Sequence, residues 1–266
     1  MEALFFQVLL LLIPSQHYFH LSGLIALNGI HLFKRHRSFS LIFLLIMILN
    51  LMVQSAFFEG YSILIKPLIC LSLDYYLYRE SNMKAGFNRL IFAGLIFSLT
   101  GDVLLLYAGS DVYLFLYGLV SFLMAHIVYS SAFFRDFKNN PQESKYYGHL
   151  MLFLMGVFSI SYYSWIRDYL NNFKIPVLAY IFVISIMAIL AAYRYRRVNL
   201  LSFRLICLGA VFFVISDSAL AFRKFVEPYS FAGILIMSTY MIAQFLITMG
   251  TIERRVVEKS QADKKV

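Results

Sequence analysis

Two aspartates lie inside long apolar segments of the sequence, in similar local contexts. Asp102 ends the stretch Phe-Ser-Leu-Thr-Gly-Asp, and Asp217 ends the stretch Phe-Val-Ile-Ser-Asp. A carboxylate in the centre of a bilayer costs roughly 2.5–3.5 kcal/mol on insertion scales, so ionisable groups kept there usually belong to a site or a pathway. The two carboxyl groups are therefore candidates for an acid–base pair inside a membrane. The alternative for each is a structural role as a hydrogen-bonded cap near a helix end.

Four further polar side chains occupy other apolar segments. His126 and Tyr129 are three positions apart, and Tyr240 and Gln244 are four apart, so each pair lies on one face of its helix. We expect the second pair to hydrogen-bond to the first across the helices. A single histidine in such a segment is equally compatible with a packing role.

Lys66 and Pro67 stand near the start of another apolar segment. Proline within a helix frees a backbone carbonyl and kinks the helix. The ammonium group of Lys66 can extend to the membrane interface. Alternatively, it faces inward and pairs with a carboxylate or with a lipid phosphate.

The remaining polar residues give weaker signals. Asp74 lies near one end of its apolar segment, where an interfacial position is expected. Cys70 and Cys207 have no metal-ligand spacing and are interpreted as free, buried packing residues. The sequence contains no P-loop, Gly-x-Ser-x-Gly, His-Glu-x-x-His or dinucleotide-binding glycine pattern, and its N-terminal histidines have no acidic partner nearby. We therefore expect neither a metal nor a cofactor.

The chain around these residues is strongly apolar. Hydrophobic residues make up 61% of the 266 positions, mean hydropathy is +0.75, and only 14% of residues are charged. A soluble domain has about 25% charged residues, so the composition predicts an all-α integral membrane protein. Runs long enough to cross a ~30 Å hydrocarbon core are predicted at 39–57, 61–78, 86–107, 111–134, 147–165, 175–194, 201–222 and 229–252.

The distribution of positive charge predicts the orientation of these eight spans. Net charge is +9, and the connections on one side hold 18 of the 23 lysines and arginines, against 4 on the other side. The positive-inside rule places the basic side and the C-terminus in the cytoplasm. Orientation thus accounts for the charge, and no basic patch interleaved with aromatic residues indicates a nucleic-acid partner. The sequence leaves open whether the membrane is the bacterial inner membrane or the endoplasmic reticulum.

Three regions are predicted along the chain. Residues 1–35 form an apolar extension that is an extra span, a re-entrant pair or an interfacial helix. They lack the basic residues of a secretory signal before the first apolar run. Residues 36–252 form the eight-helix domain, and 253–266 form a basic cytoplasmic tail.

The eight spans divide at residues 135–146 into two sets of four. An even number of helices per set predicts parallel rather than inverted repeats. Three landmarks recur in the same order, although chance similarity between apolar helices is the alternative: Pro67 and Pro176, Asp102 and Asp217, Gly118 and Gly233.

The order and spacing of these polar residues resemble the YhhN-type lysoplasmalogenase family of eight-span membrane proteins. The resemblance covers residues 39–252, and the extension 1–35 departs from it. Its motifs are Lys66-Pro67, Ser98-x-x-Gly101-Asp102, Phe122-x-x-x-His126-x-x-Tyr129, Ser216-Asp217 and Tyr240-x-x-x-Gln244.

The resemblance implies hydrolysis of the vinyl-ether bond of a lysoplasmalogen, with release of a fatty aldehyde and glycerophospho-ethanolamine or -choline. The partner would be a lysophospholipid in the bilayer. Such bonds break after protonation of carbon, which requires an acid that is neutral at physiological pH, and a carboxyl group in a low-dielectric site favours its neutral form. A second carboxylate can then activate water, as in acetal hydrolysis. Asp102 and Asp217 would be this pair. The residues expected to orient them or to bind substrate are His126, Tyr129, Tyr240, Gln244, Ser216 and, for the phosphate, Lys66.

Two other functions fit the same residues. A lipid or small-solute transporter could use the aspartates and Lys66 as a relay, and a structural or regulatory membrane protein could use them only for packing. One geometric difficulty also remains. At ~1.5 Å per residue, Asp102 lies about 8 Å from the outer end of its helix and His126 about 22 Å, which would place them in different layers.

Overall fold

The computed structural model describes residues 35–53, 59–109 and 111–257. The chain divides into two units, residues 1–44 and 45–266. In the first unit, the described residues contain the beginning of helix α3 (Arg37–Val53), where the rings of Phe39 and Phe43 stack at 6.1 Å. The following description concerns the second unit.

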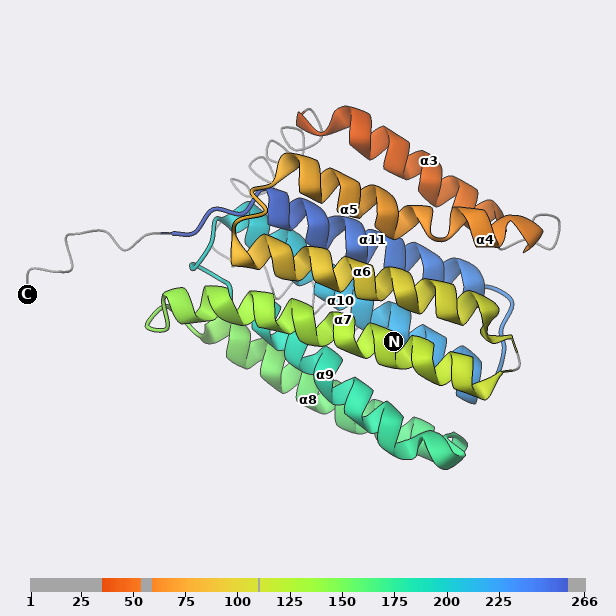
Figure 1. Cartoon of the computed structure of the whole chain (residues 1–266). Coiled ribbons are helices and arrows are strands. Elements are labelled where there is room, and N and C mark those ends of the chain that lie inside the picture. Colours follow the sequence, from red (N-terminus) through yellow and green to blue (C-terminus); the bar gives the residue numbers. More distant parts are fainter. Residues whose placement is uncertain (1–34, 54–58, 110, 258–266) are drawn as a thin grey trace, which may run out of the picture. The chain divides into compact units, whose positions relative to one another are not determined.

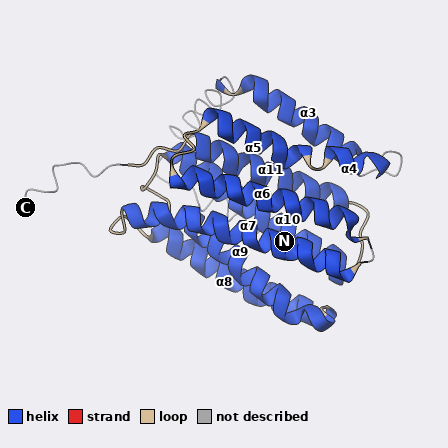
Figure 2. Ribbon diagram, viewed as in Figure 1, coloured by secondary structure: helices blue, strands red, loops and turns tan. Residues whose placement is uncertain are grey.

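The second unit is a bundle of helices that run roughly parallel and antiparallel to one another (Figure 1). After the end of α3 come α4 (Ser62–Ile65), α5 (Leu68–Glu80), α6 (Gly86–Ala108), α7 (Val112–Asn139), α8 (Tyr146–Ile166), α9 (Lys174–Ala192), α10 (Leu200–Phe225) and α11 (Ala232–Ile252). Short 3-10 turns precede α4 and connect α8 to α9. Within the described ranges there is no β-strand, as Figure 2 shows, and one isolated bridge joins Val198 to Val256.

Six helical segments of the described chain are long and apolar enough to cross a membrane: Gly86–Ala108, Val112–Asn139, Tyr146–Tyr169, Asn171–Ala192, Leu200–Phe225 and Ala232–Ile252. They match the last six predicted spans, so the prediction of an all-α membrane protein is confirmed. The first two predicted spans appear as the 17-residue helix α3 and as the broken pair α4 and α5. The predicted extension lies outside the described residues apart from its last position, Arg35.

Proline explains why one predicted span is broken. Lys66 and Pro67 separate α4 from α5, because proline offers no N–H to the helix and its ring crowds the preceding turn. Pro176 occupies the third residue of α9 instead, where the missing N–H is one that the helix would leave unpaired anyway. The two matched prolines therefore have different structural effects.

Small residues allow the pairs α6–α7 and α10–α11 to approach closely. A Cβ atom on Gly101 would lie 2.6 Å from the ring of Phe122, and one on Gly209 would lie 3.0 Å from the Ala243 carbonyl. Glycine at such positions lets helices pack backbone to backbone in the absence of a hydrophobic driving force between them. The duplication of the two sets of four helices stays a prediction.

A buried ionic cluster joins the helix ends near the C-terminal segment. The Asp136 carboxylate accepts a hydrogen bond from Arg194 Nε at 2.8 Å and one from Arg254 Nε at 3.0 Å. Both Asp136 and Arg194 are fully buried. Burial lowers the pKa of Arg194, and the facing carboxylate opposes that effect. Such a cluster makes removal of one partner costly, because the remaining charges stay buried.

Candidate active site

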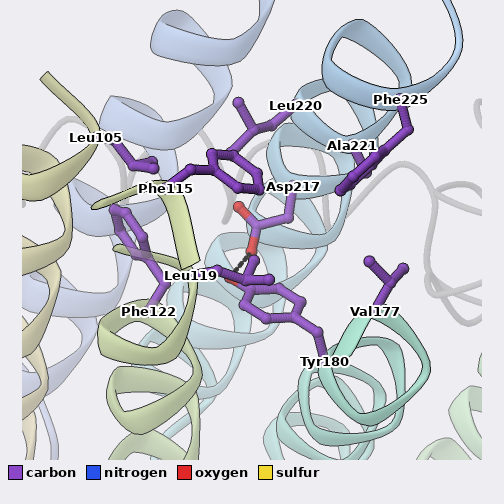
Figure 3. A pocket seen from close by; sticks show the side chains of 10 residues that line it. All are labelled: Leu105, Phe115, Leu119, Phe122, Val177, Tyr180, Asp217, Leu220, Ala221 and Phe225. Carbon is purple, nitrogen blue, oxygen red and sulfur yellow. Dashed lines mark hydrogen bonds between the residues drawn. The ribbon is translucent and has the colours of Figure 1, made fainter. Parts of the chain in front are cut away.

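A cleft between α7, α9 and α10 exposes the Asp217 carboxyl group to a largely apolar space (Figure 3). It contains about 430 Å³ of empty space, including space open to the outside. Its walls are formed by Leu105, Phe115, Leu119, Phe122, Val177, Tyr180, Asp217, Leu220, Ala221 and Phe225.

Tyr180 and His126 both contact one oxygen of Asp217 at the inner wall of this cleft. Tyr180 donates its hydroxyl to Asp217 Oδ2 at 2.6 Å, and His126 Nε2 lies 2.9 Å from the same oxygen. His126 Nε2 also lies 3.0 Å from the Tyr180 hydroxyl. Figure 3 shows the second carboxyl oxygen turned away from Tyr180, toward the apolar side chains that line the cleft. One oxygen is thus anchored while the other faces the space that a substrate could enter.

The imidazole of His126 is fully enclosed by the protein. It packs edge-on against Phe213 at 4.8 Å and against Tyr180 at 5.4 Å. Its Nδ1 has no hydrogen-bond partner among the described residues. The acceptor oxygen of Asp217 facing Nε2 favours the tautomer that carries its hydrogen on Nε2, which leaves Nδ1 as an acceptor without a partner among the described residues.

Asp102 belongs to a separate hydrogen-bonded chain. Its Oδ2 accepts a hydrogen bond from Tyr240 at 2.6 Å, and Gln244 Nε2 donates to the Tyr240 hydroxyl at 3.3 Å. Gln244 Oε1 in turn accepts the hydroxyl of Tyr129 at 2.9 Å. The predicted hydrogen bond between the two polar helix faces is present, and it joins α7 to α11.

Aromatic rings separate the two aspartates. The ring of Tyr240, which holds Asp102, contacts Phe122 at 5.8 Å and Phe213 at 5.6 Å between centroids. Phe122 lines the Asp217 cleft and Phe213 packs on His126. Asp217 lines the cleft and Asp102 does not, so their pairing as acid and base stays a prediction. The difference in depth expected between Asp102 and His126 creates no conflict here, because His126 contacts Asp217 rather than Asp102.

The other expected site residues lie outside the cleft. Lys66 is half-buried at the break between α4 and α5, and its positive charge interacts electrostatically with the Asp102 carboxyl group. Ser216 is buried and donates to the Ile236 carbonyl at 3.0 Å, which ties α10 to α11. A structural use of Ser216 thus accounts for its hydroxyl.

Asp74 and Cys70 are both buried on α5. Asp74 is only 4% exposed and neither carboxyl oxygen has a hydrogen-bond partner among the described residues, so its side chain is enclosed by other helices, while its interfacial depth stays a prediction. Cys70 and Cys207 are free and buried, as expected. Cys70 is more than packing, however, because its sulfur lies 3.2 Å from the Tyr240 hydroxyl and 3.8 Å from Asp102 Oδ2.

Tyr180 is the site residue that sequence reasoning missed. It is one of 19 tyrosines, and many tyrosines in membrane helices belong to interfacial belts. The feature that could have distinguished Tyr180 from tyrosines of an interfacial belt is its position in the interior of α9, away from either helix end. Among the described residues, no group of three or more His, Cys, Asp and Glu side chains could hold a metal ion.

Comparison with known proteins gives a family for this arrangement. The YhhN family matches residues 61–251. The chain belongs to the YhhN family. It is 33% identical over 172 residues to human lysoplasmalogenase TMEM86A, which covers 62% of this chain and 66% of the relative. It is 30% identical over 188 residues to rat lysoplasmalogenase TMEM86B, with 70% of each chain covered.

The match to TMEM86A spans slightly less than two thirds of that protein. Asp102, His126 and Asp217 all lie inside the region that matches the YhhN family, residues 61–251. No solved structure matches this chain.

Proposed function

We propose that this YhhN-family protein is a membrane hydrolase that cleaves the vinyl-ether bond of a lysoplasmalogen, releasing a fatty aldehyde and glycerophospho-ethanolamine or -choline. The observation that carries the proposal is the Asp217 carboxyl group at the wall of an apolar cleft, bonded to Tyr180 and His126. The names of the TMEM86A and TMEM86B relatives indicate the same reaction.

The chemistry requires a proton on carbon before water can react. In the first step, the Asp217 carboxylic acid would protonate the vinyl carbon remote from oxygen, and the double-bond electrons form the new C–H bond. The resulting oxocarbenium ion lies beside the Asp217 carboxylate, whose negative charge stabilises it in a low-dielectric space. Tyr180 and His126 keep the anchored oxygen in place during this change of charge.

Water completes the reaction. It adds to the carbon that bears the ether oxygen, and its proton passes to the Asp217–His126 pair, giving a hemiacetal. Collapse of the hemiacetal forms the aldehyde carbonyl and breaks the bond to the glycerol oxygen, which takes up a proton. The overall change consumes one water, and Asp217 and His126 return to their initial protonation states.

The distances favour His126 over Asp102 as the direct partner of Asp217. His126 lies within hydrogen-bond distance of Asp217, whereas rings of Phe122 and Phe213 stand on the Asp102 side. Asp102 would then act with Tyr240, Gln244 and Tyr129 as a positioning group, holding α6, α7 and α11 in register behind the cleft wall. The orientation with a cytoplasmic C-terminus, inferred from the basic connections, is part of the same proposal.

Aldehyde release by the purified protein tests the proposal. The substrate is a 1-alkenyl lysophospholipid, and the matched controls are its 1-alkyl and 1-acyl analogues, which lack the vinyl-ether bond. We expect one aldehyde per substrate consumed, and none from the analogues. Absence of aldehyde from the alkenyl lipid, together with its passage across vesicle membranes, would instead favour the transporter alternative.

A further inference from the structure

A lysine that the proposed reaction has not yet used lies over Phe115, one of the residues that line the Asp217 cleft. The Nζ atom of Lys224 lies 4.5 Å from the ring centroid of Phe115. Phe173 and Phe225 complete an aromatic cluster there, with both rings 6.0 Å from Phe115. A cation over an aromatic ring keeps its remaining faces free for an anion.

Helix geometry places this ammonium group directly beyond the carboxyl group. Lys224 follows Asp217 by seven residues in α10, so the two share one helix face at a spacing of about 10.5 Å along the axis. Leu220 and Ala221, which lie between them, line the cleft. The lysine and the aspartate therefore mark the two ends of one continuous apolar wall.

This spacing fits a lysophospholipid. Seven bonds separate the vinyl carbon that Asp217 would protonate from phosphorus, a span of about 8 Å when extended. An ammonium–oxygen hydrogen bond adds about 2.8 Å, which brings the total close to the spacing between Asp217 and Lys224. A phosphate held by Lys224 would thus set the vinyl ether beside the free oxygen of Asp217.

We propose that Lys224 is the phosphate-binding residue of the cleft, and that it selects vinyl ethers attached to a phosphorylated glycerol. This inference rests on the proposed function and identifies the residue that would recognise the phosphate group of the substrate. No carboxylate among the described residues forms an ion pair with Lys224, so its charge is not neutralised within the described chain. Lys66, the residue first expected to bind phosphate, lies instead at the break between α4 and α5 and is not among the residues that line the cleft.

The test compares two alkenyl substrates, one with the phosphate head group and one ending at the glycerol. Lys224→Gln should raise KM for the phosphorylated substrate about tenfold, the usual effect of losing a charge-assisted hydrogen bond, with kcat within about twofold. KM for the alkenylglycerol should not change, and Lys224→Arg should restore most of the affinity. Arg223→Gln is the matched control, because Arg223 is adjacent and exposed like Lys224 but points about 100° away around the helix.

Equilibrium binding of the uncleavable 1-alkyl lysophospholipid and of 1-alkylglycerol separates this inference from the proposed function. If the wild-type protein releases no aldehyde but Lys224→Gln still weakens binding of the phosphorylated lipid alone, the function is wrong and the phosphate site stands. The Lys224 proposal is overturned if Lys224→Gln leaves phosphate selectivity intact, if Arg223→Gln has the same effect, or if Lys66→Gln alone removes the selectivity.

Discussion

Asp217→Asn is the most direct perturbation of the proposed chemistry. The asparagine keeps the size of the side chain, and its amide oxygen can still accept the Tyr180 hydroxyl that now lies 2.6 Å from Oδ2. It cannot deliver a proton to carbon, and it cannot carry the negative charge that stabilises the oxocarbenium ion. The substitution therefore separates acid–base function from the shape of the site.

The expected loss follows from these two roles. General acid–base catalysis contributes about 10²–10⁴-fold, so kcat should fall at least about a hundredfold, equivalent to roughly 2.7 kcal/mol of activation free energy. KM should change little, because the lining of the cleft is otherwise apolar. Removing the charge from two hydrogen bonds should cost only about 1 kcal/mol of stability, so the variant should remain folded in detergent.

The assay is single-turnover aldehyde release from a 1-alkenyl lysophospholipid, with monodispersity and thermal melting measured on the same samples. Tyr180→Phe is the matched comparison, because it removes one hydrogen bond to Asp217 and leaves the carboxyl group; we expect a loss of about tenfold. The double variant Asp217→Asn/His126→Gln should be scarcely worse than Asp217→Asn, since residues that act as a unit are strongly non-additive. Turnover within about threefold of wild type in Asp217→Asn would refute the carboxylic-acid mechanism.

Three further outcomes follow from the structure. His126→Gln should lower kcat by about 10²-fold with little change in melting temperature, and a loss confined to KM would remove His126 from the acid–base pair. Asp102→Asn should reduce activity less than Asp217→Asn, because Asn still accepts the Tyr240 hydroxyl; an equal or larger loss would restore Asp102 as a direct participant. Asp136→Asn should destabilise the fold by about 3–5 kcal/mol, since Arg194 beside it is fully buried. The control Asp168→Asn removes an exposed pair with Arg167 and should leave the melting temperature unchanged.

The helical spans could be predicted because each depends on its own composition. Apolar length alone identifies the segments of α6 to α11, and Pro67 marks the break before α5. The hydrogen bond between Tyr129 and Gln244 could also be anticipated, since each belongs to a polar pair on a helix face. In these cases, the length and residue spacing of each helix taken alone are enough to predict the observed feature.

The partners of the aspartates could not be predicted in the same way. Spacing along a helix does not determine how neighbouring helices are rotated about their axes. Tyr180 of α9 meets Asp217, and Tyr240 of α11 meets Asp102, but each helix is apolar on several faces. The burial of Asp74 could not be predicted for a related reason, because distance from a helix end does not determine which face turns inward.

The two aspartates resemble each other in sequence but differ in what surrounds them. Each accepts a tyrosine hydroxyl at 2.6 Å, and there the similarity ends. Asp102 is 4% exposed, and Tyr240, Gln244 and Cys70 extend its contacts into the bundle. Asp217 has a fully buried histidine on one side and an apolar cleft on the other. A proton on Asp217 can therefore reach a ligand, whereas the contacts of Asp102 lead to other side chains. If the halves arose by duplication, the tyrosine donor to the aspartate changed from α11 to α9 between them, and Asp217, unlike Asp102, lines the cleft.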